Sequence, residues 1–190
     1  MTLHPSGRGA VTYADYLALP DDGRRWQVLD GVLVEMTPAP RTTHQAAQHV
    51  LAYLIEGWLE THPGTGVVLP APTDVVLDAY NVVEPDLVFV AAARGAIVLE
   101  SHIAGAPDLA VEILSPSSVR IDRVLKFALY ARHRVPWLWI VDPEAGTIEE
   151  FRLAGDAYQL PARHAGAEGF EPGLFPGLVI PLGRVFHLRR

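Results

Sequence analysis

Two short apolar runs each carry an acidic residue in their interior, and this feature limits the folds that are open to the chain. Glu112 interrupts Leu109–Leu114, and Asp86 lies inside Val82–Val90. Runs of this length and composition predict buried β-strands. A carboxylate inside a buried strand is costly unless a cation, a metal ion or hydrogen-bond donors accompany it. The sequence therefore predicts a sheet whose strands bring two acids to a site that supplies such partners.

The surrounding patterns predict further strands together with helices. The predicted elements are a capped helix at Tyr13–Leu19, a hairpin at Arg25–Met36 turning at Asp30-Gly31, a helix at Thr43–Glu60, a strand from Val67 that continues past two prolines to Asp78, strands at Val82–Val90 and Leu109–Leu114, a helix at Val119–His133, a strand at Trp137–Val141, and a hairpin formed by Ile148–Leu153 and Ala157–Leu160. This order predicts an α/β fold, in which helices flank a mixed central sheet and β-hairpins are added at both ends. We expect a single domain over residues 1–190, with a flexible start at 1–10 and a β-rich extension at 148–190.

Composition excludes several classes of protein. The chain has 190 residues and no cysteine, which rules out disulfides, cysteine-bound zinc and thiol catalysis. No apolar run approaches the roughly 20 residues of a membrane helix. The polar start, Met1–Ala10, lacks the apolar core of a signal peptide. We therefore expect a cytoplasmic protein without membrane association. A net charge of −7 argues against a protein that coats DNA, but it is compatible with an enzyme that has a local basic patch.

Lys126 is the single lysine beside fourteen arginines, and its position relative to Glu112 is informative. Glu112 lies roughly 7 Å before the end of its strand, at about 3.3 Å per residue. If the next helix starts near Val119 and runs back along the sheet, Lys126 lies about 10 Å along it, at about 1.5 Å per residue. Helical side chains lean toward the N-terminus, so the ammonium is predicted to reach the level of Glu112. Asp86, Glu112 and Lys126 can therefore form one site, and carboxylate oxygens suit Mg²⁺ or Mn²⁺.

Motifs along nearly the whole chain, from about Tyr13 to Pro181, resemble those of a known superfamily. Val83–Val90 resembles its second motif, and Ala106–Ser118 followed by Asp122, Lys126 and Tyr130 resembles the next one. The superfamily is that of the PD-(D/E)XK nucleases, and the combination resembles the Uma-type family of restriction-endonuclease-like proteins. Three further segments fit the same family: Trp26–Gly31, His44-Gln45 and Trp137–Pro143.

The resemblance implies a restriction-endonuclease-like core and a Mg²⁺- or Mn²⁺-dependent endonuclease that hydrolyses DNA, acting as a homodimer. It assigns catalysis to Asp86, Glu112 and Lys126, and metal binding to Asp86, Glu112 and the Ile113 carbonyl. Two departures from the family pattern stand out. Leu114 occupies the usual lysine position two residues after the glutamate, so Lys126 must take over that role. Gln27 stands where the family often has glutamate.

A second hypothesis belongs to another class: a nuclease-like scaffold with weak or no catalysis, acting as a nucleic-acid-binding or assembly module. The acidic charge and Gln27 favour it, whereas the presence of all three core residues argues against it. Fold alone does not decide between the two.

Ordinary structural roles compete with the functional ones at each position. Asp86 can cap a turn after Pro85, Glu112 can pair with a buried arginine, and Lys126 can pair with Asp122 one helical turn away. Other residues also have two interpretations. Asp108 fits local turn chemistry better than catalysis, His44 and Gln45 fit core or capping roles better than the site, and Tyr130 fits packing. Arg120 and Arg123, with Arg132 and Arg134, are either phosphate contacts or a solvated helix face.

Overall fold

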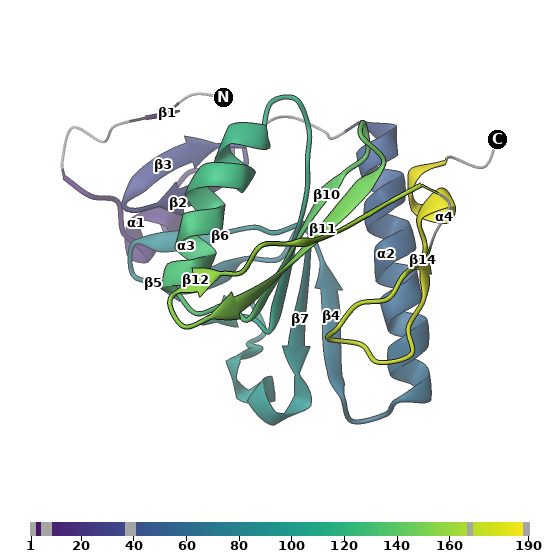
Figure 1. The fold of residues 1–190 in the computed structure, drawn as a ribbon. Helices are drawn as coiled ribbons and strands as arrows, with labels where there is room; N and C mark the ends of the chain where they lie inside the picture. Colours follow the sequence, from purple (N-terminus) through teal and green to yellow (C-terminus); the bar gives the residue numbers. More distant parts are fainter. Residues whose placement is uncertain (1–2, 5–8, 37–40, 167–168, 188–190) are drawn as a thin grey trace.

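A computed structural model describes residues 3–4, 9–36, 41–166 and 169–187. The elements up to residue 36 lie on one side of the molecule, and the helices Thr42–Thr61 and Leu182–Phe186 lie side by side on the other (Figure 1). The expected flexible start, residues 1–10, lies mostly outside the described residues. The mixed α/β architecture predicted from the sequence is confirmed.

The larger sheet holds the predicted central strands. Its order is β12-β11-β10-β9-β7-β4, with β13 also paired to β11. Strands β9 and β10 run parallel, and the other pairs are antiparallel. The strands are β4 (Gly66–Pro70), β7 (Leu87–Ala91), β9 (Leu109–Ile113), β10 (Trp137–Asp142), β11 (Thr147–Ala154), β12 (Ala157–Tyr158) and β13 (Ala162–Ala165). The sheet is therefore mixed, and β9, which carries Glu112, lies in its interior.

The smaller sheet has the order β1-β3-β2-β6-β5-β8. Its strands are β1 (Leu3–His4), β2 (Trp26–Leu29), β3 (Val32–Glu35), β5 (Val75–Asp78), β6 (Asn81–Val83) and β8 (Ile103–Ala104). The predicted hairpin turn is present between β2 and β3, where Asp30 and Gly31 both have positive φ, at 50° and 71°. This is the backbone that an Asp-Gly hairpin turn requires. A short pair, β14 (Gly169–Phe170) and β15 (Ile180–Pro181), completes the strands.

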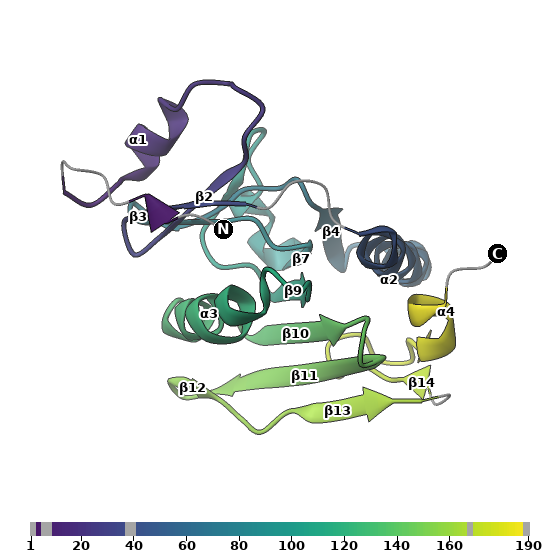
Figure 2. The same cartoon turned by 90° about the horizontal axis from the view of Figure 1, so that it is seen from above.

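Helices cover both faces of the larger sheet. Figure 2 shows α2 and α4 on one side and α3 on the other. The helices are α1 (Tyr13–Leu17), α2 (Thr42–Thr61), the 3₁₀ helix η1 (Ala92–Ile97), the π-helix η2 (Ile121–Lys126), α3 (Phe127–Arg132) and α4 (Leu182–Phe186). The capping box predicted at Thr12 and Asp15 is formed, but α1 ends at Leu17, two residues before the predicted end. No described helix combines the length and apolarity needed to cross a bilayer.

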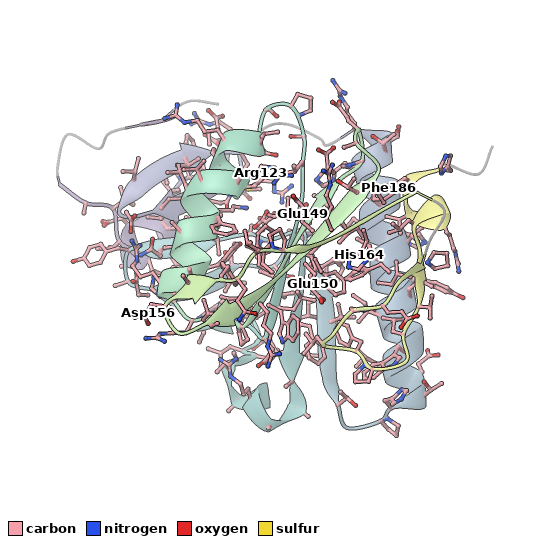
Figure 3. All side chains as sticks on the ribbon, viewed as in Figure 1. Arg123, Glu149, Glu150, Asp156, His164 and Phe186 are labelled. Atoms are coloured by element: carbon pink, nitrogen blue, oxygen red, sulfur yellow. The ribbon has the colours of Figure 1, made fainter. Side chains whose placement is uncertain are left out.

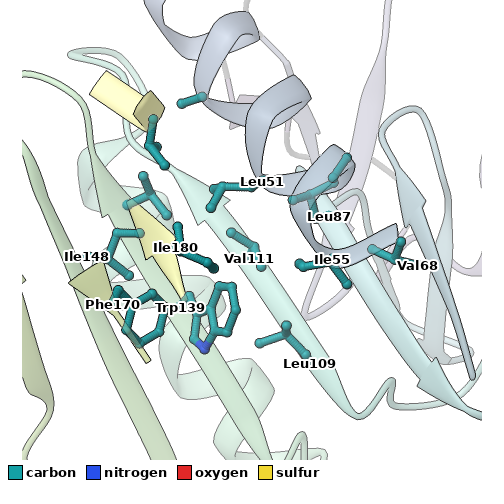
Figure 4. Packing of buried hydrophobic residues seen from close by; sticks show 14 of the residues in the cluster. Leu51, Ile55, Val68, Leu87, Leu109, Val111, Trp139, Ile148, Phe170 and Ile180 are labelled. Atoms are coloured by element: carbon teal, nitrogen blue, oxygen red, sulfur yellow. The ribbon is translucent and has the colours of Figure 1, made fainter. Parts of the chain in front are cut away.

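Alternation along β9 assigns its residues to two separate cores. Leu109, Val111 and Ile113 face α2, where they join Leu51 and Ile55 (Figure 4). Ala110 belongs to the second core, under α3. Because successive side chains of a strand point to opposite faces, Glu112 shares the α3 side with Ala110. Because side chains alternate between the two faces of β9, Glu112 faces the helix predicted at Val119–His133.

Two predicted strands were wrong in their extent. Val82–Val90 is divided at Glu84-Pro85-Asp86 into β6 and β7, which belong to different sheets. The predicted strand from Val67 to Asp78 is divided in the same way into β4 and β5, across Ala71-Pro72. Proline has no N–H for a strand ladder. The chain therefore passes from one sheet to the other at Pro72 and again at Pro85. The break lies next to Asp86, whose backbone still pairs with the Val111 carbonyl and the Ala71 N–H.

The helix predicted at Val119–His133 starts at Val119, continues as the π-helix η2 from Ile121 to Lys126, and becomes α-helical again at Phe127. The predicted C-terminal hairpin is present in β11 and β12, and β11 forms six residue pairs with β10. The extension thus starts inside the larger sheet. Its later part also contributes to the α2 core, through Phe170, Phe175 and Ile180.

Phe175 should be required for stability, because it is fully buried and packs edge-on against Phe89, Trp58 and Trp139. We expect Phe175→Ala to lower the free energy of unfolding by about 3–5 kcal/mol. Urea denaturation measures this loss. Leu160→Ala is the control, because Leu160 is 97% exposed. Equal stability of the two variants would show that the C-terminal segment does not belong to the core.

Candidate active site

A cavity of about 230 Å³ opens where the two sheets, α2 and η2 meet. The smaller sheet, the β6–β7 bend, the end of β9 and the first turns of α2 and η2 all contribute to it. Its polar lining consists of Arg25, Gln27, Glu35, His44, Gln45, Gln48, Glu84, Asp86, Glu112, Ser115, Ser117, Ser118, Asp122 and Lys126. The three predicted catalytic residues all lie in this lining.

Asp86 and Glu112 reach the cavity from neighbouring strands of the larger sheet. In the register of β7 with β9, Leu87 is opposite Val111, and the Asp86 N–H donates to the Val111 carbonyl at 2.9 Å. The next position on each strand therefore places Asp86 beside Glu112, on the same face. The expectation that both carboxylates face one cleft agrees with the structure.

The Asp86 carboxylate is held by backbone and by helix α2. Its Oδ2 accepts a hydrogen bond from the Ile113 N–H at 2.6 Å. Its Oδ1 lies 3.2 Å from Nε2 of His44. The Gln48 side-chain amide donates to the backbone carbonyl of Asp86 at 2.9 Å. Asp86 thus does more than cap the turn after Pro85, because it connects β9 to α2 at the wall of the cavity.

Glu112 is paired with Lys126, and both side chains are only 3% exposed. Nζ of Lys126 lies 3.0 Å from Oε1 and 2.9 Å from Oε2 of the carboxylate. The Tyr130 hydroxyl donates to Oε1 at 2.5 Å. The partner of Glu112 is therefore the lone lysine, and the rise calculation that placed Lys126 level with Glu112 agrees with the geometry. The Lys126 ammonium also lies 3.6 Å from Oδ1 of Asp122, so the ion pair expected along the helix is present as well.

Three carboxylates around one ammonium leave the cavity with excess negative charge. Burial raises the pKa of Glu112 and of Asp122, and Lys126 offsets only part of this effect. Burial lowers the pKa of Lys126, but Glu112 and Asp122 more than compensate, so the lysine pKa is raised. Burial also lowers the pKa of His44, and interactions with Asp86 and the Ile113 backbone reverse this shift to a net increase. The site thus favours cations.

This chemistry fits the expected divalent metal. Asp86 and Glu112 supply carboxylate oxygens, Ile113 supplies a backbone carbonyl, and all three line the cavity. Hard oxygen ligands of this kind suit Mg²⁺ or Mn²⁺. No three histidine or acidic side chains of the described residues form a metal-binding cluster by themselves. A bound ion would therefore need the Ile113 carbonyl and water beside the two carboxylates.

Gln27, the departure from the family pattern, is buried beside the cavity. Its side-chain oxygen accepts a hydrogen bond from the Glu84 N–H at 3.1 Å. The Glu84 carboxylate in turn forms an ion pair with Arg25. Gln27 therefore joins β2 to the bend that precedes Asp86.

The other candidate residues lie outside the cavity. Arg123 forms an ion pair with Glu149 of β11 at 2.6 Å (Figure 3), and Arg120 is exposed. Arg132 and Arg134 pair with Asp30 and Asp156. Asp108 accepts a hydrogen bond from the Ala91 N–H and pairs with Arg94, which agrees with its local structural interpretation.

Comparisons with known proteins agree with this architecture. A family model described as "Uma2: Putative restriction endonuclease" matches residues 13–183. The chain belongs to the Uma2 family. A crystal structure of a putative nuclease belonging to DUF820, from Anabaena variabilis ATCC 29413, matches with a TM-score of 0.75 and 19% sequence identity. The match covers 93% of this chain and 97% of that chain. At this identity the likeness establishes a shared fold. No curated protein matches the chain.

Two contacts of this Uma2 family site were not anticipated. Tyr130 was interpreted as packing, yet its hydroxyl donates to Glu112. His44 was expected to cap or to fill the core, yet it contacts Asp86. The spacing of Lys126 and Tyr130, four residues apart on one helix, was a signal that both face the same strand. For His44 the signal was the resemblance of His44-Gln45 to the family, and no spacing predicted the contact, which depends on how α2 packs against the sheet.

The Tyr130 hydroxyl should contribute measurably to stability, because its acceptor is a buried carboxylate. We expect Tyr130→Phe to lower the free energy of unfolding by about 1.5–3 kcal/mol, since hydrogen bonds to charged groups are the stronger ones. Tyr158→Phe is the matched control, because that hydroxyl donates to the neutral Val135 carbonyl at 2.8 Å. Chemical denaturation compares the two, and a smaller loss for Tyr130→Phe would contradict the assignment.

Proposed function

We propose that this chain is a divalent-metal-dependent endonuclease that hydrolyses phosphodiester bonds in DNA. The convergence of Asp86, Glu112 and Lys126 on one cavity carries the proposal. In it, Asp86, Glu112 and the Ile113 carbonyl hold Mg²⁺ or Mn²⁺. Such an ion supplies a water of lowered pKa and positive charge opposite the phosphate.

Each protein group has a distinct task in this proposal. The Ile113 N–H orients the Asp86 carboxylate through Oδ2, and Oδ1 lies beside Nε2 of His44. Tyr130 orients Glu112 by donating to one of its two oxygens. Lys126 presents a compact ammonium beside Glu112, where it can orient the attacking water or stabilise charge on the phosphate. Burial of these groups strengthens their electrostatic effect.

Substrate contacts outside the cavity are assigned to two basic residues. Arg120 immediately precedes η2 and Arg123 lies within it, next to the cavity wall formed by Ser117, Ser118 and Asp122. Arg123 would exchange Glu149 for a DNA phosphate, whereas Arg120 is exposed. A homodimer, which presents one site to each DNA strand, belongs to the same proposal.

A catalytically weak scaffold remains the second candidate, and a specific observation favours it. Lys126 contacts both oxygens of Glu112 and Tyr130 contacts one, so the carboxylate is already well satisfied without a metal. The net charge of −7 also opposes close approach of DNA.

A cleavage assay decides between the two candidates. Plasmid and labelled oligonucleotide DNA are incubated with Mg²⁺, Mn²⁺ or a chelator. We expect cleavage with metal, none with chelator, and none for Asp86→Ala. Asp108→Asn is the matched control, because Asp108 also follows a proline but lies outside the cavity. Absence of cleavage by the folded wild-type protein on every substrate would favour the scaffold.

Binding of Mg²⁺ or Mn²⁺ should stabilise the fold, because an ion that binds only the native state shifts the folding equilibrium. At an ion concentration 100 times the dissociation constant, the expected gain is about 2.7 kcal/mol. Thermal denaturation and calorimetry measure this effect. Asp86→Ala should remove it and Asp108→Asn should retain it. A midpoint that neither metal moves, together with no heat of binding, would contradict the metal site.

The single lysine should not tolerate replacement by arginine, although the charge is kept. A planar guanidinium is bulkier than an ammonium and cannot occupy the same buried position. We expect Lys126→Arg to lower the cleavage rate on the order of 100-fold or more, as for loss of an electrostatic stabiliser. Arg24→Lys is the reciprocal control, because Arg24 is exposed, pairs with Asp22 and lies outside the cavity. Circular dichroism checks folding of both variants, and full activity of Lys126→Arg would refute the role.

A further inference from the structure

Asp122 is a buried acid that the proposed catalytic group does not use. Its side chain is 5% exposed, and it lines the same cavity as Glu112. The ion pair found for it in the described part of the chain joins Oδ1 to Nζ of Lys126 at 3.6 Å. A carboxylate is costly to bury, so the buried position of Asp122 beside Lys126 indicates a role for this acid.

The Lys126 ammonium lies between two acids but is hydrogen-bonded to only one of them. Both oxygens of Glu112 are within 3.0 Å of Nζ. The Glu84 carbonyl oxygen, at 3.5 Å, and Asp122 Oδ1, at 3.6 Å, lie farther away. A small rotation of the flexible lysine side chain would transfer a hydrogen bond from Glu112 to Asp122.

The π-helix η2 aligns Asp122 with this lysine. Asp122, Lys126 and Tyr130 are spaced four residues apart, and all three are buried. In a continuous α-helix, eight residues turn a side chain by about 80° away from its starting direction. The wider π turn between Ile121 and Lys126 reduces this drift, so the three side chains share one face. π-Helical turns are frequent at functional sites.

We propose that Asp122 is a positioning residue for Lys126, the second anchor that keeps the ammonium in the cavity when Glu112 is engaged by a divalent cation. The cation part rests on the proposed function. Anchoring by Asp122 does not, because it can be tested without metal. Glu112 cannot give its full charge both to a cation and to Lys126. A buried lysine without a carboxylate partner would have no anchor in the cavity.

The composition provides an unusually direct probe. Lys126 is the only lysine, so lysine labelled with ¹³C and ¹⁵N gives one side-chain signal in the nuclear magnetic resonance spectrum. The same protein in urea provides the reference position for a free lysine. Glu112→Gln mimics engagement of Glu112, since it removes the charge and keeps the shape. Circular dichroism establishes that each variant is folded.

In Glu112→Gln, we expect the Lys126 signal to stay distinct from the urea reference. In Glu112→Gln combined with Asp122→Asn, it should move most of the way to that reference. Asp30→Asn is the matched control, because Asp30 pairs with Arg132 near the other end of the same helix, and asparagine tolerates its positive φ. This control should leave the signal unchanged.

Two results would overturn the proposal. One is a Lys126 signal already at the reference position in Glu112→Gln, and the other is a signal that Asp122→Asn leaves unchanged in that background. If Asp122→Asn prevents folding, the Glu112→Gln spectrum alone decides.

Addition of Mg²⁺ to the wild-type protein separates this inference from the proposed function. If metal binds, Lys126 should shift yet remain distinct from the reference, and Asp122→Asn should lose that distinction. A signal that reaches the reference in metal-bound wild type would overturn the anchoring role. If calorimetry detects no metal, the proposed function fails, and the Glu112→Gln comparison still decides the role of Asp122.

Discussion

The ion pair between Lys126 and Glu112 is the interaction on which the rest of the site depends. Both side chains are almost fully buried, and the pair joins the larger sheet to the helix that crosses it. Removal of one partner from a buried pair typically costs about 3–5 kcal/mol, because the other charge is left without compensation. The helix position, the face of β9 and the Tyr130 hydroxyl are therefore tied to one geometry. A site held in this way stays organised before any substrate arrives.

The bend at Pro85 makes the cavity accessible. An unbroken strand through this segment would continue the larger sheet beyond Asp86. Instead β6 turns into the smaller sheet, and the smaller sheet forms one wall of the cavity. The Ala71 N–H donates to the Asp86 carbonyl at 2.9 Å, so the two broken ribbons support each other at the bend. Residues that interrupt the sheet thus create the space in which a substrate can be bound.

Charge is distributed unevenly between the cavity and the surface. The cavity collects Asp86, Glu112 and Asp122 around one lysine, which attracts cations and repels a polyanion. Several surface arginines are already paired with acids, including Arg123 with Glu149 in Figure 3. Approach of nucleic acid would therefore depend on cations that screen the cavity and on exchange of these surface pairs.

Patterns in the sequence are enough to select the residues that could carry chemistry. Acids in apolar strands cannot be buried without partners, and alternation along β9 decides which face Glu112 occupies. The lone lysine stands at the helical rise that matches Glu112. These are local properties with fixed repeats, so Asp86, Glu112 and Lys126 could be selected, and most helices and strands located, from pattern alone.

Other features of the fold and the site depend on tertiary contacts. The division of Val82–Val90 between two sheets depends on what each half pairs with, although Pro85 marks the place. The contact between His44 and Asp86 depends on the packing of α2, and the common face of Asp122, Lys126 and Tyr130 depends on a π turn. Contacts of this kind join residues far apart in the chain, or follow from a local distortion, and no repeat in the sequence encodes them.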